Sequence, residues 1–224
     1  MTGSAIKDLV IVKMEEKSAF GPETDENLLA GNDILDGVKP IYDYIDASMS
    51  EAANEMLLTL PLHRLASVAV EIDDDSVLRD TEIIINGKMT YTRTGKIWKP
   101  DNWLRFYTLW LVGWERPVYE VIFPSNFAYI HQFNESTRGT PQKPVVTDDG
   151  NWLHFYSIPE GMPASIKQFL YIPKFSLVQD YPIDVAELIA LNVARKVFEV
   201  FGATEQVKIM QGEIESLLKM FEVV

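Results

Sequence analysis

Hydrophobic residues recur with helical spacing near the start of the chain. Ile6, Leu9, Val10 and Met14 fall on one face, which predicts a short amphipathic helix over residues 4–16.

A second helix is predicted over residues 40–59. Pro40 suits its first position and Pro61 must end it. Ser48 and Glu51 have the capping-box spacing, so the pattern permits a break near residue 48. The segment 18–38 between the two helices is rich in glycine and acids and is expected to be a loop.

The same helical spacing returns at the C-terminal end. Asp184 opens a predicted helix that Gly202 ends, and Thr204 is the expected cap of a last helix. The two helices would form an αα-hairpin joined by Phe201–Ala203. Their apolar stripes consist of Val185, Ile189, Val193, Val197 and Val200 in the first, and Val207, Met210, Ile214, Leu217, Leu218 and Phe221 in the second.

Between the helical ends the period changes to two, which predicts strands. Asn86-Gly87 lies between β-prone runs and indicates a hairpin, and the sequence TDDGN at 147–151 indicates another. Fourteen of the chain's 25 aromatic residues lie between Trp98 and Tyr156, a density typical of a small β core. The predicted strands are 65–72, 82–86, 88–93, 103–112, 118–123, 145–146, 152–158 and 169–172.

This order of elements predicts an α+β fold. Residues 1–62 and 180–224 are expected to form a helical bundle, with residues 63–179 inserted as an antiparallel β-rich module.

Composition narrows the classes of function. The 224 residues include no cysteine, so disulfides and thiolate metal sites are excluded. No run approaches the roughly 18 apolar residues of a membrane span, and the N-terminus lacks a secretory pattern. We therefore expect a protein made in a cytosol, with no membrane partner.

The net charge of −13 is uneven, because residues 1–60 hold 12 acids against 4 lysines. An acidic chain is a poor candidate for binding nucleic acid, because that affinity comes mainly from Lys and Arg that neutralise phosphates. The charge suits solubility, or a surface past which DNA slides without sticking. Candidates for such an acidic surface are Glu23, Asp25, Glu26, Asp33 and Asp36.

Motifs for catalysis are not recognisable. His63, His131 and His154 lack metal-ligand spacing, and the acids of 73–75 lack the glycine and distal glutamate of a calcium loop. Nucleotide-binding glycine motifs and a nucleophile elbow are also missing. We expect no cofactor, no metal site and no enzymatic activity, although two acids converging in space stay an open possibility.

Two turns combine glycine or proline with arginine and an adjacent strand. They are Gly113–Val118 (GWERPV) and Arg138–Pro144 (RGTPQKP). One interpretation is a pair of rigid turns with exposed arginines. The other is a subunit interface, for which the candidate residues are Trp114, Arg116, Arg138 and Lys143.

With these turns, residues 40–220 resemble the podovirus head-to-tail adaptors. The matching features are the helix Ile41–Leu60, the strand entry Lys99–Arg105, the turn Gly113–Val118, the run Asn134–Pro144 and the closing helix Asp184–Phe201. The comparable proteins are the tubular adaptors of T7-like phages and the ring proteins of crAss-like phages. The acidic 18–38 segment and the high tryptophan content depart from that pattern.

The resemblance implies a structural virion protein of the phage neck or tail, made in the cytoplasm of a bacterial host. It implies a homo-oligomeric ring, a dodecamer, that contacts the portal protein and other tail ring proteins. Viral DNA would pass through it without sequence-specific contact.

Two other functions compete with this interpretation. Exposed Trp and Tyr side chains on β structure are also typical of a carbohydrate-binding module, and the aromatic density of residues 98–156 motivates that alternative. The other is a tail enzyme that cleaves glycan or peptidoglycan with two carboxylates, for which no residue pattern argues.

Overall fold

The computed structural model describes residues 1–18, 41–72, 78–85, 88–134, 136–159 and 164–222. It is an α+β protein that divides into two compact units. The helical unit comprises Met1–Val68 and Lys174–Val224, and the sheet unit comprises Ala69–Pro173. The boundaries lie at 68/69 and 173/174, so residues 63–68 and 174–179 belong to the helical unit and not to the inserted module.

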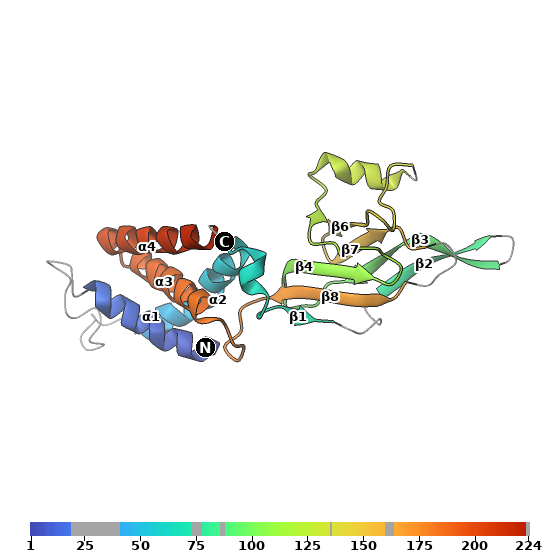
Figure 1. The fold of residues 1–224 in the computed structure, drawn as a ribbon. Coiled ribbons are helices and arrows are strands. Elements are labelled where there is room, and N and C mark those ends of the chain that lie inside the picture. The colour runs from blue at the N-terminus through green and yellow to red at the C-terminus, as the bar shows by residue number, and fades with distance from the viewer. Residues whose placement is uncertain (19–40, 73–77, 86–87, 135, 160–163, 223–224) are drawn as a thin grey trace. The chain divides into compact units, whose positions relative to one another are not determined.

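The helical unit contains α1 (Gly3–Ser18), α2 (Ile41–Thr59), α3 (Ile183–Val200) and α4 (Thr204–Glu222). Helix α3 packs against the other three. It can do so because it is buried nearly all round. Seven consecutive residues, Leu188–Ala194, are buried, and so are Val185, Ala186, Val197 and Phe198 on either side of them. Figure 1 shows α3 running beside α4, with which it forms the expected hairpin.

The predicted helices correspond closely to those observed. Gly202, with φ +70°, follows the C-terminal end of α3 and stops that helix as expected. Helix α2 runs without interruption through Ser48, so the optional break does not occur. The Thr204 hydroxyl donates to the Gly202 carbonyl at 3.3 Å, a contact different from the expected cap on the first helical N–H groups.

The strand predicted over 65–72 is wrong. After Pro61, residues Leu62–Leu65 form the 3₁₀-helix η2, and only Val70–Glu71 pair as β1. The amides of Arg64 and Val68 donate to the carbonyls of Pro61 and Leu65 at 3.0 Å. Leu65 and Val68 are both buried because residues three apart lie on the same face of successive turns. In a strand, they would lie on opposite faces.

The sheet unit consists of two sheets. One has the strand order β1-β8-β4 and the other β2-β3-β7-β6-β5. The remaining strands are β2 (Leu78–Ile85), β3 (Lys88–Trp98), β4 (Trp103–Leu111), β5 (Val121–Ile122), β6 (Val145–Asp149), β7 (Trp152–Tyr156) and β8 (Ile166–Pro173). The pairings are antiparallel except that of β5 with β6, which is parallel.

Both predicted hairpins are present as strand pairs. β2 pairs with β3, although Asn86-Gly87 itself lies outside the described residues, and β6 pairs with β7 across Gly150 at φ +60°. A single apolar cluster draws residues from both sheets, including Phe106, Leu109 and Phe169 from one and Ile97, Leu153 and Phe155 from the other. The core of the unit thus lies between its sheets.

The strand predicted over 118–123 is mostly absent. Val118 makes an isolated bridge with Leu109, and only Val121 and Ile122 form β5. Pro117 and Pro124 lack the N–H that would extend the ladder on either side. The chain then forms a 3₁₀-helix, η4 (Phe127–Phe133), which the hydrophobic pattern did not predict.

Candidate functional site

The turn Gly113–Val118 is anchored in the core by Trp114. This side chain is 4% exposed, and its indole Nε1 donates to the Ser157 carbonyl at 3.2 Å. Its ring meets Phe155 edge to face, with centroids 6.3 Å apart. Trp114 is therefore a core residue, and its assignment as a subunit-interface contact is wrong. Burial between the sheets removes the large apolar indole from water, which is more favourable than exposing it at the surface of the turn.

The second turn is built from side chain and backbone together. Asn134 accepts hydrogen bonds from the Ser136 amide and hydroxyl at 3.0 and 2.8 Å. The Arg138 amide donates to the Asn134 carbonyl at 2.9 Å, and Thr140 and Lys143 exchange backbone hydrogen bonds of 3.1 and 2.9 Å. The described residues of this run, Asn134 and 136–144, thus form a hydrogen-bonded turn.

The structure brings the two turns together. The Glu115 amide donates to the Pro141 carbonyl at 3.0 Å. Arg116 and Pro144 line one open groove of about 540 Å³, together with Tyr119, Glu120 and Ile122. Arg116 and Lys143 are exposed, so these two interface candidates lie on the surface.

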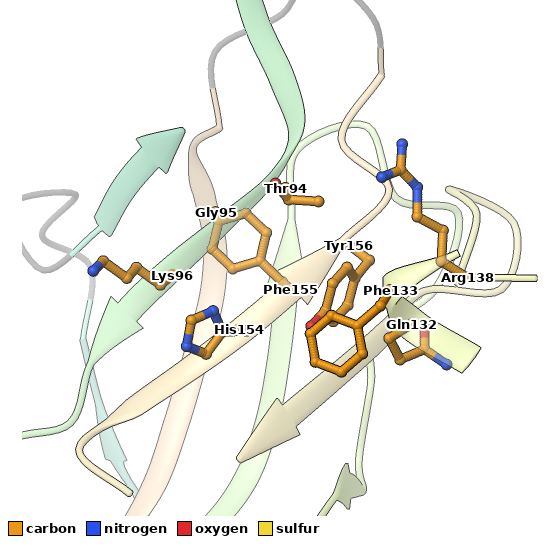
Figure 2. A pocket seen from close by; sticks show the side chains of 9 residues that line it. All are labelled: Thr94, Gly95, Lys96, Gln132, Phe133, Arg138, His154, Phe155 and Tyr156. Carbon is orange, nitrogen blue, oxygen red and sulfur yellow. The ribbon is translucent and has the colours of Figure 1, made fainter. Parts of the chain in front are cut away.

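Arg138 lies elsewhere, beside a second pocket of about 390 Å³ (Figure 2). Neighbouring strands β3 and β7 supply its floor, where Thr94, Gly95 and Lys96 pair with Tyr156, Phe155 and His154. Gln132 and Phe133 from η4 complete the lining. In Figure 2, the rings of Phe133, Tyr156 and His154 lie between Lys96 on one side and Arg138 on the other.

The polar groups of this pocket already have partners. Gln132 is 5% exposed; its Nε2 donates to the Ala128 carbonyl at 3.1 Å, and its Oε1 accepts from the Gly139 amide at 3.0 Å. Lys96 Nζ lies 4.2 Å from the centre of the Trp152 ring, and His154 Nε2 is 3.5 Å from Asp149 Oδ2. The lining carries two cations and no carboxylate. The pocket therefore favours aromatic, polar or anionic groups over cations.

An apolar ridge runs along η4. We give this name to Phe127, Ile130 and Phe133, which are 76, 64 and 68% exposed. The ridge was not predicted from the sequence, because its aromatic residues were assigned to the β core. The signal that marks it is Asn126, whose Oδ1 caps η4 by accepting from the Ala128 amide at 2.9 Å.

An apolar loop lies at residues 174–182 of the helical unit. Leu177 and Val178 at its tip are 51 and 89% exposed, although Tyr181 at its base is buried. The sequence analysis placed no element here and did not predict a surface.

A pair of carboxylates also converges, in the helical unit. Glu187 and Glu213 line a small groove of about 220 Å³ between α3 and α4. Each is ion-paired, Glu187 with Lys13 at 3.0 Å and Glu213 with Lys17. Burial alone would lower the pKa of Lys13, but the hydrogen bond to Glu187 and the charges of Glu187, Glu16 and Glu213 raise that pKa above its ordinary value. Both carboxylates of the pair are thus held in ion pairs with lysines of α1.

The remaining predicted candidates are the acidic residues of the 18–38 segment and two of the histidines. The acids Glu23, Asp25, Glu26, Asp33 and Asp36 lie outside the described residues. His63 and His131 are exposed and lie in η2 and η4. Within the described ranges, no three His, Asp or Glu side chains gather as metal ligands would. None of the helices in that part of the chain is both long and apolar enough to cross a membrane.

Comparison with the models of known protein families gives no match, and no curated protein matches the sequence.

Proposed function

We propose that this chain is a structural subunit of a phage neck or tail ring, which connects the portal to downstream tail components and leaves a channel for DNA. The observation that carries the proposal is the meeting of the two turns on which the resemblance rests. The hydrogen bond from Glu115 to Pro141 joins them into one surface with Arg116 and Lys143 exposed. The planar guanidinium group of Arg116, held on this turn, is well suited to binding a neighbour's carboxylate.

The division into two units also supports an assembly role. Each unit presents exposed apolar side chains, the ridge on one and the loop on the other. Exposed apolar patches on well-packed units are typical of protein–protein contact. The ring would act by binding and shape alone, with no turnover.

The test is assembly of the purified chain with the portal protein of the phage that encodes it. Native mass spectrometry and negative-stain imaging should show a ring of this chain on the portal. Arg116→Ala with Lys143→Ala should reduce ring formation, while Lys208→Ala, which removes an exposed cation from α4, should not. A chain that stays monomeric and ignores the portal contradicts the proposal.

A second candidate function is glycan binding, favoured by the pocket of Figure 2. Phe133 is exposed and lines this pocket with Tyr156, and sugars stack on such rings. The chain should then bind strongly to glycans on an array, and Phe133→Ala should abolish that binding. Phe127→Ala, on the same helix but outside the pocket lining, should leave it intact. If the chain binds no glycan on the array, glycan binding is excluded for the glycans sampled.

A further inference from the structure

The outer face of β3 continues beyond the pocket of Figure 2. Side chains alternate between the two faces of a strand, and Ile97 of β3 belongs to the core between the sheets. Thr94, Lys96 and Trp98 therefore lie on the opposite, outer face. Thr94 and Lys96 line the pocket, whereas Trp98 lies two residues further along the strand and outside the lining. The face that holds the pocket thus extends to Trp98.

Strand β7 supplies a matching row of side chains. Residues directly opposite each other in an antiparallel pair share a face of the sheet. The three pairs, in order along the strands, are Thr94 with Tyr156, Lys96 with His154, and Trp98 with Trp152. From Thr94 to Trp98 the row covers four residue steps of a strand, or about 13 Å. We call this row the outer strip.

An exposed aromatic ring lies at each end of the outer strip. Phe133 is 68% exposed at the pocket end, where it meets Tyr129 edge to face with centroids 5.2 Å apart. Trp98 is 40% exposed at the other end, where its ring meets Trp152 at 80° with centroids 4.7 Å apart. Lys96 Nζ covers Trp152 at 4.2 Å, so Trp98 is the ring of that pair left for a ligand. Rings fixed in this way lose little freedom when a flat ligand packs on them.

The polar groups between the two rings include both donors and acceptors. Lys96 donates, the Thr94 hydroxyl can do both, and Asp149 beside the strip accepts. Asp149 Oδ2 lies 3.5 Å from His154 Nε2, and the two side chains are 60 and 34% exposed. Sugar hydroxyls also donate and accept, so this mixed set suits an uncharged sugar better than a strongly charged group.

We infer that the outer strip binds an extended, uncharged polysaccharide chain, with one sugar ring against Phe133 in the pocket and a later ring of the same chain on Trp98. The pocket of about 390 Å³ does not include Trp98, and about 13 Å of strand is longer than a single sugar ring. This inference rests on glycan binding, the second candidate function, and names its ligand class. It is independent of the proposed ring.

The experiment is isothermal titration calorimetry of the full chain with three sets of sugars. Two are uncharged, the β-1,4-linked oligomers of glucose and of N-acetylglucosamine from monosaccharide to hexamer. The third is the acidic series of galacturonic acid oligomers. The variants are Trp98→Ala, Trp98→Phe and Phe133→Ala. Tyr119→Ala is the matched control, because Tyr119 is 57% exposed in the same unit but lines the other groove.

Wild type should bind the long oligomers of an uncharged series about tenfold or more tightly than the short ones, because only a long chain reaches both rings. Trp98→Ala should reduce the affinity for long oligomers to that for short ones and leave short-sugar binding unchanged. Trp98→Phe keeps a ring and should retain the preference for length. Phe133→Ala should weaken binding at every length, and Tyr119→Ala should match wild type.

Several outcomes would overturn the inference. An affinity that does not rise with length, or a Trp98→Ala variant that binds long oligomers like wild type, removes the chain and leaves glycan binding at the pocket. Binding of the acidic series alone removes the uncharged ligand. No binding to any series removes both the inference and the second candidate function. If Trp98→Ala loses only assembly on the portal, the strip is a protein contact. Ring formation itself is measured in the separate portal assay, so none of these results decides it.

Discussion

The indole Nε1 of Trp114 donates a hydrogen bond to the backbone carbonyl of Ser157, 43 residues further along the chain. This bond joins the Gly113–Val118 turn to the residue that follows β7, where Ser157 takes a positive φ of 86°. Trp110 adds a second tie, since its Nε1 donates to the Trp114 carbonyl at 2.9 Å. The turn is therefore held by the core of the sheet unit.

We expect Trp114→Ala to lower the free energy of unfolding by about 3–5 kcal/mol, because it leaves a cavity between the sheets. Trp114→Phe should lose about 1–2 kcal/mol, since the ring remains but the hydrogen bond to Ser157 does not. Urea unfolding followed by circular dichroism measures both. Arg116→Ala in the same turn is the control and should change stability by less than about 0.5 kcal/mol. If Trp114→Ala and Arg116→Ala lower the free energy of unfolding equally, Trp114 is not the anchor of this turn.

Gly113 should tolerate substitution less well than Gly150. Both have positive φ, of 88° and 60°. A Cβ atom at Gly113 would lie 2.7 Å from Pro159 Cγ, whereas nothing lies within 4 Å at Gly150. Gly150→Ala should therefore cost about 1 kcal/mol for the backbone alone, and Gly113→Ala about 1–2 kcal/mol more. Thermal unfolding of the two variants beside wild type tests the order, and equal melting temperatures would contradict it.

Periodicity was sufficient to predict the helices, because each of them buries one regular face, and the turn sequence at 147–151 was sufficient to predict the β6–β7 hairpin. Val185, Ile189 and Val193 mark α3 by local spacing alone. The same reasoning failed at Leu65–Ile72, because the buried Leu65 and Val68 are three residues apart, which is the spacing of the 3₁₀ turns after Pro61 and not that of a strand.

The candidate site was predictable only in part. Arg116 and Lys143 are exposed as expected, but Trp114 carries the same turn motif and lies in the core. A turn motif does not tell which side chain points inward, since that depends on the opposite sheet. The contact between Glu115 and Pro141 spans 26 residues and depends on how β4 and β6 are placed, which no local pattern contains.

The apolar ridge was missed for a related reason. Aromatic residues are normally buried, so Phe127 and Phe133 were counted with the core, whereas Gln132 between them is the side chain that points inward. An inverted pattern of this kind, with a polar residue buried and its apolar neighbours exposed, is itself a sign of a binding surface.

Gly212 offers a stabilising change. It lies inside α4, is exposed, and a Cβ atom built there meets nothing within 4 Å. Gly212→Ala should raise the free energy of unfolding by about 0.5–1 kcal/mol, because alanine loses less backbone entropy in a helix. Denaturant unfolding checks this. A destabilised variant would show that a neighbour outside the chain's own fold approaches this position.

The junction of α2 and α3 should give the helical unit a pH dependence. Asn192 is buried and donates to the Ala52 carbonyl at 2.9 Å and to Glu55 Oε2 at 3.3 Å, while Lys196 binds Glu51 and Glu55 at 2.6 and 3.1 Å. Partial burial alone would raise the pKa of Glu55, but the hydrogen bonds from Lys196 and Asn192 outweigh it and lower that pKa. The hydrogen bond to Glu51 raises the pKa of Lys196, against the smaller effect of burial.

Glu55→Gln should therefore destabilise the protein only where the carboxylate is charged. A lowered pKa in the folded state means that the stabilisation is complete above the ordinary pKa of glutamate and is lost as the pH falls through the folded value. Since Glu55 is about half exposed, solvent screening limits the loss at neutral pH to about 0.5–1 kcal/mol. Melting temperatures of variant and wild type should differ near pH 7 and converge towards about pH 2. Asp8→Asn, on the exposed side of α1, is the control and should leave the melting temperature near that of wild type. A difference that stays constant with pH would show that Glu55 acts through packing and not through its charge.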